Sequence, residues 1–379
     1  MEHICCGCSA CALVCPTNAI KMKVNEDGFY TADIDKEKCI HCGLCDKICI
    51  YNNDKAELGE KIANKGLYSA HTKNEKSREQ CSSGGIANEI AEEFIKKGYA
   101  IVGVVYDSEN AKAKHIVVNE DNKNLLEELK GSKYLQSENY EAFSDIINMN
   151  EKAVVFGTPC QIAGIAKVLE LNKKRENFIL VDIFCHGVPS YNLWKRYLEK
   201  LDKEYKTGNM PEVVFRDKKK GWHEYNIKIS SNENIYENER KKDIFYRCFL
   251  NSICDSESCY QCKFRNTSYA DIRLGDYWGE RYAKDEKGYS MVAVNTELGE
   301  GILNKLENID ILKTDIKDRF SQQTINIRKP RTYKKNLKML KEKNSNFSKL
   351  ILKIKMVDII NRLKRKIKRI IIRSNNGGK

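Results

Sequence analysis

The 379-residue sequence has little of what membrane-spanning or exported proteins need. No stretch approaches the roughly 18 consecutive apolar residues that a membrane-spanning helix requires. Residues 1–10 lack the apolar core of a secretory signal peptide. Acidic residues are scarce at the C-terminal end, where residues 328–379 hold 19 lysines and arginines but only two acids. The rest of the chain is mildly acidic, so nucleic-acid binding is not indicated. We therefore expect a cytoplasmic protein with a separate basic tail.

Cysteine is abundant instead, with sixteen residues in a long chain. Without a signal peptide, this number favours metal binding in a reducing compartment over a disulfide framework. Eight of the cysteines form two copies of the spacing Cys-x2-Cys-x2-Cys-x3-Cys. That spacing is the run of bacterial two-cluster ferredoxins, in which the fourth cysteine of each copy ligates the other cluster.

The run predicts two [4Fe-4S] clusters. The first would be held by Cys5, Cys8, Cys11 and Cys49. The second would be held by Cys39, Cys42, Cys45 and Cys15. Structural zinc and disulfides are the alternatives, but zinc sites use pairs of cysteines rather than triplets with a distant fourth ligand. Cys6 is surplus to both sets.

A second group of cysteines lies far along the chain, at Cys254, Cys259 and Cys262. Three cysteines this close need a fourth ligand, and the candidates are Cys160, Cys185 and Cys248. We favour Cys185, because it follows a predicted apolar strand. A third [4Fe-4S] cluster is expected here rather than zinc, given the two clusters already predicted.

Between the two cysteine groups, short apolar strands alternate with segments of helical periodicity, which is typical of α/β structure. Two predicted strands, at 152–156 and 178–184, end in loops that each carry a cysteine, Cys160 and Cys185. Ligands of such folds bind at the carboxyl ends of the strands. We therefore expect these two loops to converge on one site.

A Ser/Gly loop, residues 82–85, leads directly into a predicted helix at 86–95. Backbone N–H groups at a helix start suit a phosphate, such as the pyrophosphate of a dinucleotide cofactor. An ordinary helix cap with glycines for the turn is an equally good interpretation.

The predicted fold class is α+β, with a bacterial-ferredoxin-like domain fused to a mixed α/β domain that has a β-rich C-terminal part. The predicted divisions are a ferredoxin-type domain at 1–52, a linker at 53–66, an α/β part at 67–211, a β-rich part with the third cluster at 212–328, and a basic tail at 329–379. Residues 349–373 carry apolar residues at spacings of three and four, edged by lysine and arginine. That pattern is typical of a helix lying on an anionic membrane surface. Docking on the body or on an acidic partner are the alternatives.

Several of these segments together resemble the coenzyme F420 hydrogenase/dehydrogenase beta-subunit family, over about residues 1–315. The segments are Ser82–Gly85, Gly157–Gln161, Cys185–Ser190, Cys259–Cys262 and Asp271–Gly279. The resemblance implies an FAD-binding α/β domain with its own [4Fe-4S] cluster beside the flavin. It also implies reduction or oxidation of F420 or of another organic substrate.

Under this resemblance, the FAD phosphates or ring would be held by two loops and a lysine, namely Ser82, Ser83, Gly84, Gly85, Gly157, Thr158, Cys160, Gln161 and Lys133. His186 is the candidate proton donor, since an imidazole titrates near neutrality. A loop histidine bonded to the backbone is the alternative for His186, and we favour it slightly. Lys133 and Arg265 have an equally simple interpretation as fold-stabilising side chains.

The predicted function is that of an iron–sulfur flavoprotein oxidoreductase. It would pass electrons between the ferredoxin-type clusters and an FAD site that reduces or oxidises F420 or another organic substrate. The partner would be a redox protein or a small-molecule electron carrier, with peripheral membrane contact through the tail. An electron-transfer subunit without its own substrate is the first alternative, and an interaction module without a redox role is the second.

Overall fold

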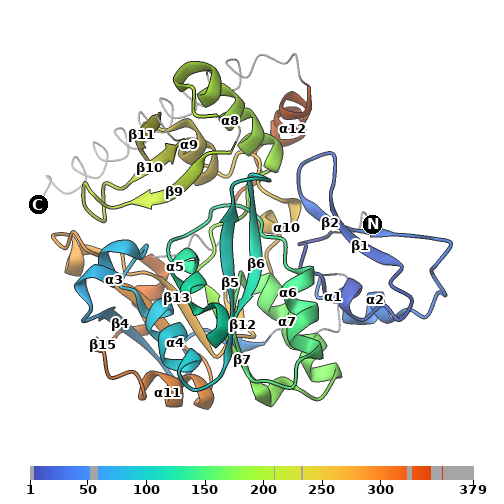
Figure 1. Ribbon diagram of the computed structural model, residues 1–379, viewed down its shortest axis with the longest axis horizontal. Helices are drawn as coiled ribbons and strands as arrows, with labels where there is room; N and C mark the ends of the chain where they lie inside the picture. The colour runs from blue at the N-terminus through green and yellow to red at the C-terminus, as the bar shows by residue number, and fades with distance from the viewer. Residues whose placement is uncertain are drawn as a thin grey trace, which may run out of the picture.

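A mixed eight-stranded sheet lies at the centre of the computed structural model, which describes residues 4–51, 59–208, 210–231, 234–321, 327–342 and 352 (Figure 1). The strand order is β15-β4-β14-β13-β8-β7-β5-β6. The strands are β4 (Gly66–Thr72), β5 (Ala100–Asp107), β6 (Lys112–Val118), β7 (Ala153–Phe156), β8 (Phe178–Ile183), β13 (Ile272–Asp276), β14 (Ser290–Val294) and β15 (Ile309–Thr314). The four inner strands β5, β7, β8 and β13 run parallel, and the outer pairs are antiparallel.

Helices cover both faces of this sheet. They are α3 (Glu75–Gln80), α4 (Ile86–Ile95), α5 (Leu126–Leu129), α6 (Tyr140–Asn148), α7 (Pro159–Leu171) and α11 (Glu297–Leu303). Successive side chains of a strand point to opposite faces. On β7, Val154 joins the apolar cluster that contains α4, while Val155 joins the cluster that contains α6 and α7. This double burial explains why the inner strands are continuous apolar runs rather than alternating ones.

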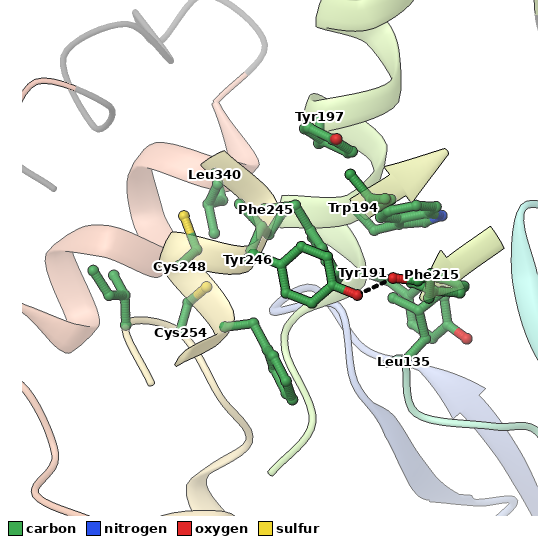
Figure 2. Packing of buried hydrophobic residues seen from close by; sticks show 14 of the residues in the cluster. Leu135, Tyr191, Trp194, Tyr197, Phe215, Phe245, Tyr246, Cys248, Cys254 and Leu340 are labelled. Atoms are coloured by element: carbon green, nitrogen blue, oxygen red, sulfur yellow. Dashed lines mark hydrogen bonds between the residues drawn. The ribbon is translucent and has the colours of Figure 1, made fainter. Parts of the chain in front are cut away.

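A smaller antiparallel sheet packs on an aromatic cluster at one end of the molecule (Figures 1 and 2). Its strands are β9 (Glu212–Asp217), β10 (Asn226–Ser230) and β11 (Ile235–Glu239). The helices α8 (Tyr191–Tyr205), α9 (Ile244–Leu250) and α12 (Tyr333–Lys341) supply most of the other side of this cluster. The chain then returns through β13, β14 and β15 to the central sheet. The predicted division at 211/212 therefore does not separate two sheets, because strands on both sides of it pair with each other.

The N-terminal unit consists of α1 (Ala10–Leu13), the hairpin β1 (Ile20–Val24) and β2 (Tyr30–Ile34), and α2 (Leu44–Ile48). The hairpin lies between the two cysteine runs. This unit lies beside α6 and α7, at the edge of the main domain (Figure 1).

The structure describes parts of the predicted linker and of the predicted basic tail. Within the predicted linker, β3 (Glu60–Lys61) pairs with β12 (Thr267–Ser268), so this segment is attached to the main domain. In the predicted tail, α12 packs its buried residues Tyr333, Leu337 and Leu340 into the aromatic cluster. The proposed membrane-surface helix at 349–373 lies outside the described residues apart from Leu352. In the described part of the chain, none of the helices has the length and hydropathy to cross a bilayer.

Candidate functional site

Five cysteine side chains line one pocket at the carboxyl ends of β7 and β8. They are Cys6, Cys160, Cys185, Cys259 and Cys262, and we call this site the thiol pocket. The two strand-end loops thus meet there, as predicted. The short helix α10 (Glu257–Tyr260) and the residues after it close the pocket from the C-terminal part of the chain, and the N-terminal unit supplies Cys6.

Cys160 lies in the first turn of α7, which is fixed by a capping box. The Thr158 amide donates to Gln161 Oε1 at 3.0 Å, and the Thr158 hydroxyl donates to the same oxygen at 2.9 Å. Gln161 Nε2 in turn donates to the Ser137 carbonyl at 3.2 Å. Thr158 and Gln161 therefore hold the helix start that presents Cys160.

Two arginines hold the loops that carry the other cysteines. Arg265 lines the pocket, and its Nη2 donates to the carbonyls of His186 (3.3 Å) and Cys259 (3.2 Å). Arg273 is fully buried and forms a bidentate pair with Asp182 of β8, with both distances 2.6 Å. The same guanidinium donates to the Phe264 carbonyl, which fixes the segment after Cys262 against the sheet.

Four of the pocket thiols influence one another's ionisation. Burial, together with the neighbouring Cys160 and Cys262, raises the pKa of Cys185 to about 12. The pKa of Cys259 is raised by burial and then by Asp255, Cys185 and Cys160. Clustered buried thiolates repel one another unless a metal offsets their charge, because ionisation in a low-dielectric site is costly.

This donor set fits an iron–sulfur cluster. Four cysteines from three chain segments surround the pocket, and the Arg265 guanidinium on the wall suits the negative charge of a thiolate-ligated cluster. Among the described residues, no three Cys, His, Asp or Glu side chains meet the geometry for one shared metal ion. In a cubane each thiolate binds a different iron, so its ligands lie further apart than those of a single ion.

The structure differs from the predicted ligand set at Cys254. This residue is 1% exposed and belongs to the aromatic cluster, together with Cys248 (Figure 2). Its pKa is raised by burial and by the adjacent Asp255, with no contribution from the pocket thiols. Cys160 takes its place on the pocket wall. The sequence spacing suggested Cys254 because it lies near Cys259, but the turn between them directs the two side chains into different surroundings.

Cys6 lies between the pocket and the N-terminal unit. Its thiol packs beside those of Cys160 and Cys8, which raise the pKa of Cys6. The neighbouring Cys6 thiol in turn lowers the pKa of Cys160 to about 7. Cys8 itself packs against α7 at Gly164, where an added Cβ would lie 2.9 Å from Cys8 Sγ. A chain of sulfur contacts therefore links a predicted ligand of the first cluster to the thiol pocket.

The thiols predicted to hold the first cluster influence one another's ionisation. Burial, together with the nearby Cys8, Cys5 and Cys49, raises the pKa of Cys11 to about 12. These four thiols thus lie close together although Cys49 is distant in sequence. In the second run, burial and then Asp46 raise the pKa of Cys45, with a smaller contribution from Cys42.

Side chains of the loop at 136–139 dock the N-terminal unit on the main domain. Gln136 Oε1 accepts from the Tyr30 amide at 2.8 Å, and its Nε2 donates to the Cys6 carbonyl at 3.1 Å. Asn139 Nδ2 donates to the Gly7 carbonyl at 3.3 Å and its Oδ1 accepts from the Ser9 hydroxyl. Buried amide side chains that bond backbone groups fix the relative position of the two parts.

His186 does not line the thiol pocket. Its Nε2 lies 3.1 Å from the Phe249 carbonyl and 3.2 Å from the Ser252 hydroxyl, and burial lowers its pKa. The ring packs against Phe249, with the centroids 4.9 Å apart. This is the backbone-bonded alternative, so we assign no catalytic role to His186.

The two predicted flavin loops lie in different places. Thr158, Cys160 and Gln161 are on the wall of the thiol pocket, whereas Ser82–Gly85 are not. The polar groups of the Ser/Gly loop are used internally: Ser83 Oγ donates to the Tyr289 carbonyl and the Gly84 amide donates to Ser290 Oγ. A Cβ at Gly84 would meet the Ala70 carbonyl at 2.3 Å, so close packing accounts for this glycine.

Two lysines with lowered pKa values lie near that loop. Burial lowers the pKa of Lys133 to about 7 and that of Lys218 to about 8. Lys218 Nζ donates to the carbonyls of Arg78 (2.6 Å), Ser83 (3.3 Å) and Lys287 (2.6 Å). Lys133 Nζ donates to the carbonyls of Glu128, in α5, and Lys130. Sequence analysis missed Lys218, since one lysine in the run 218–220 carries no distinguishing signal.

Comparison with known proteins identifies the family. Residues 150–319 match the family model for the C terminus of the coenzyme F420 hydrogenase/dehydrogenase beta subunit, and residues 4–53 match the 4Fe-4S dicluster domain. Residues 150–319 therefore form a C-terminal part of this beta-subunit family. The resemblance inferred from the sequence motifs is thus confirmed, and the N-terminal unit is its dicluster domain.

Three proteins with established names are similar in sequence to this chain. An F(420)H(2) dehydrogenase subunit of Methanosarcina mazei is 22% identical over 313 residues, which cover 79% of this chain and 82% of that protein. The coenzyme F420 hydrogenase subunit beta of Methanococcus voltae is 27% identical over 191 residues, 48% of this chain and 60% of that one. The coenzyme F420-dependent sulfite reductase of Methanocaldococcus jannaschii is 26% identical over 331 residues, 80% of this chain but only 46% of the reductase.

A solved structure, titled as a xenon derivative of the F420-reducing [NiFe] hydrogenase complex from Methanosarcina barkeri, contains a chain that is 16% identical to this one. The two superpose with a TM-score of 0.43 over 67% of this chain and 82% of that one. Among the curated relatives, this chain spans less than two thirds of the hydrogenase beta subunit and of the sulfite reductase.

Proposed function

We propose that this chain is an iron–sulfur oxidoreductase that passes electrons between its dicluster domain and a third [4Fe-4S] cluster in the thiol pocket. The proposed ligands of the third cluster are Cys160, Cys185, Cys259 and Cys262. The observation that carries the proposal is the sulfur contact series from Cys8 through Cys6 to Cys160. Bound clusters accept and release one electron at a time.

The residues of the chain have two tasks in this function. Gln136 and Asn139 fix the dicluster domain so that Cys8 stays against α7. Phe264, Val188, Pro159 and Tyr51 make much of the pocket wall apolar, which limits water around the buried thiols. Arg265 places a positive charge beside them. A short, rigid and dry separation between two electron-carrying sites favours transfer over competing reactions with solvent.

We further propose that the chain binds FAD. A flavin can exchange single electrons with clusters and two electrons with F420 or another organic substrate. Lys133 and Lys218 support it, because no described carboxylate forms an ion pair with either ammonium group. Both lysines lie close to Cys81, directly before the Ser82–Gly85 loop. Lys133 would contact the pyrophosphate of the cofactor, since two of its three N–H groups bond carbonyls. Lys218 would add its positive charge only, because its three N–H groups already bond carbonyls.

A second candidate is an electron-transfer subunit without its own substrate, which serves a redox partner protein. The names of two relatives favour it, as both are called subunits. F420 is the first substrate to test, because all three relatives carry it in their names.

The test uses full-length protein purified without oxygen, chemically reduced, and mixed with oxidised F420 in a stopped-flow instrument. We expect the iron–sulfur absorbance to recover as F420 is reduced, without any partner protein. A Cys185→Ser variant should keep the dicluster absorbance and lose this reaction. If the wild type is reoxidised only when a partner is added, the second candidate holds. Absence of iron–sulfur absorbance in the wild type would refute both candidates.

A further inference from the structure

Arg216, at the end of β9, is a buried guanidinium with an unused hydrogen-bonding edge. The residue is 6% exposed. Its Nη1 donates to Asp276 Oδ2 at 2.7 Å, while Nε and Nη2 are buried without a hydrogen-bond partner among the described residues. Nε–H and Nη2–H point in the same direction from one edge of the guanidinium. That edge is the fork with which arginine binds a carboxylate or phosphate through two parallel bonds.

Aromatic rings hold this guanidinium in place. Arg216 lies over Tyr225, at 4.4 Å from the ring centroid, and over Trp278 at 5.2 Å. Trp278 stacks on Trp222 at 4.6 Å, and Trp222 Nε1 donates to the second oxygen of Asp276 at 3.1 Å. The orientation of the fork is therefore fixed before any ligand binds, which reduces the entropy lost on binding.

A second arginine shares the same two rings. Arg240 lies 5.0 Å from the Tyr225 centroid and 5.7 Å from that of Trp278, and its Nε is also buried without a described partner. Asp276 is the one carboxylate that ion-pairs with Arg216 in the described part of the chain, and Lys218 adds a further positive charge near Arg216. The charges of this site are thus positive in sum. Arg240 is half-buried, so the site reaches the surface on its side.

We infer that Arg216 and Arg240 form a binding site for an oxyanion group, a carboxylate or a phosphate, of a small organic molecule. The site is separate from the thiol pocket, whose wall includes neither arginine. A buried fork without a partner is costly, and a bidentate oxyanion satisfies both orphan donors in one step. The surplus positive charge selects an anion over a neutral amide.

Isothermal titration calorimetry on the full-length, anaerobically purified protein tests this inference. Sodium phosphate and sodium benzoate are titrated separately at constant ionic strength, so that a phosphate ligand is distinguished from a carboxylate. Arg216→Lys keeps the charge and removes the fork, Arg240→Gln removes the second charge, and Arg331→Gln removes an exposed charge elsewhere as the control.

We expect at least one anion to bind the wild type, and Arg216→Lys to weaken that binding by about tenfold or more, the usual loss for a bidentate charged contact. Arg240→Gln should weaken it as well, and Arg331→Gln should leave it unchanged. No binding of either anion, or equal binding by the wild type and Arg216→Lys, would overturn the inference. If Arg216→Lys fails to fold, the comparison of Arg240→Gln with Arg331→Gln decides in the same way. The readout requires no electron transfer, so failure leaves the proposed function intact.

Discussion

The contact between Cys8 and Gly164 gives the sharpest prediction, because it joins the dicluster domain to α7 without room for a side chain. A Cβ at residue 164 would lie 2.8 Å from Cys8 Cβ and 2.9 Å from Cys8 Sγ. Carbon and sulfur atoms pack at roughly 3.5–4 Å, so the Gly164→Ala change must open a gap of nearly an ångström. Cys8 cannot easily yield, since its neighbours are hydrogen-bonded to Gln136 and Asn139.

Two effects of Gly164→Ala oppose each other. Alanine in a helix interior is intrinsically favoured over glycine by about 1 kcal/mol. Overpacking a closed contact costs about 1–3 kcal/mol. We expect the clash to prevail by about 1 kcal/mol. For a chain of 379 residues this corresponds to a fall in unfolding temperature of about 1 °C, because the unfolding entropy grows with chain length.

The matched control is Gly301→Ala in α11, where no heavy atom lies within 4 Å of the added Cβ. This variant should unfold at a slightly higher temperature than the wild type. The assay follows the loss of iron–sulfur absorbance and of helical circular dichroism on heating without oxygen. The reasoning is wrong if both alanine variants are stabilised alike.

Three further predictions concern buried groups. Arg273→Met should lower the free energy of unfolding by about 3–5 kcal/mol, because it leaves the Asp182 carboxylate buried without its partner. The unfolding temperature should fall strongly, and adding Asp182→Asn in a double variant should partly restore it. Lys133 has a pKa of about 7 in the folded protein, so the unfolded chain binds more protons than the folded one between pH 7 and about 10. The free energy of unfolding of the wild type should therefore rise with pH through this window, relative to that of Lys133→Met. A constant difference in unfolding temperature between pH 7 and pH 9 would contradict this. Cys6→Ala should retain the wild-type iron content, because four pocket thiols remain, and a loss of about four irons would instead make Cys6 a ligand.

Much of the architecture could be predicted because the signals are local. The paired cysteine runs follow from the geometry of one cubane, and the convergence of the loops with Cys160 and Cys185 follows from parallel strands having a common carboxyl edge. The helix at 86–95 also appears as predicted, since its apolar spacing is regular.

At the candidate site, the differences from the predictions concern the direction of side chains. Cys254 and Cys259 are close in sequence, but the chain between them turns, and Cys254 enters the aromatic cluster. Cys6 was surplus to both predicted sets, and only docking on α7 brings it against Cys160. For His186, the structure shows the favoured alternative, a histidine beside the Phe249 carbonyl. Such placements depend on contacts between segments that are distant in sequence, which no local pattern encodes.

Iron and acid-labile sulfide analysis of Cys259→Ser against Cys254→Ser tests the central claim most directly. The wild type purified without oxygen should contain about twelve irons per chain, at four for each of three clusters. Cys259→Ser should fall to about eight, because it removes a thiol from the pocket, whereas Cys254→Ser should keep the full content. Equal iron loss in both variants, or about eight irons in the wild type, would contradict a third cluster in the thiol pocket.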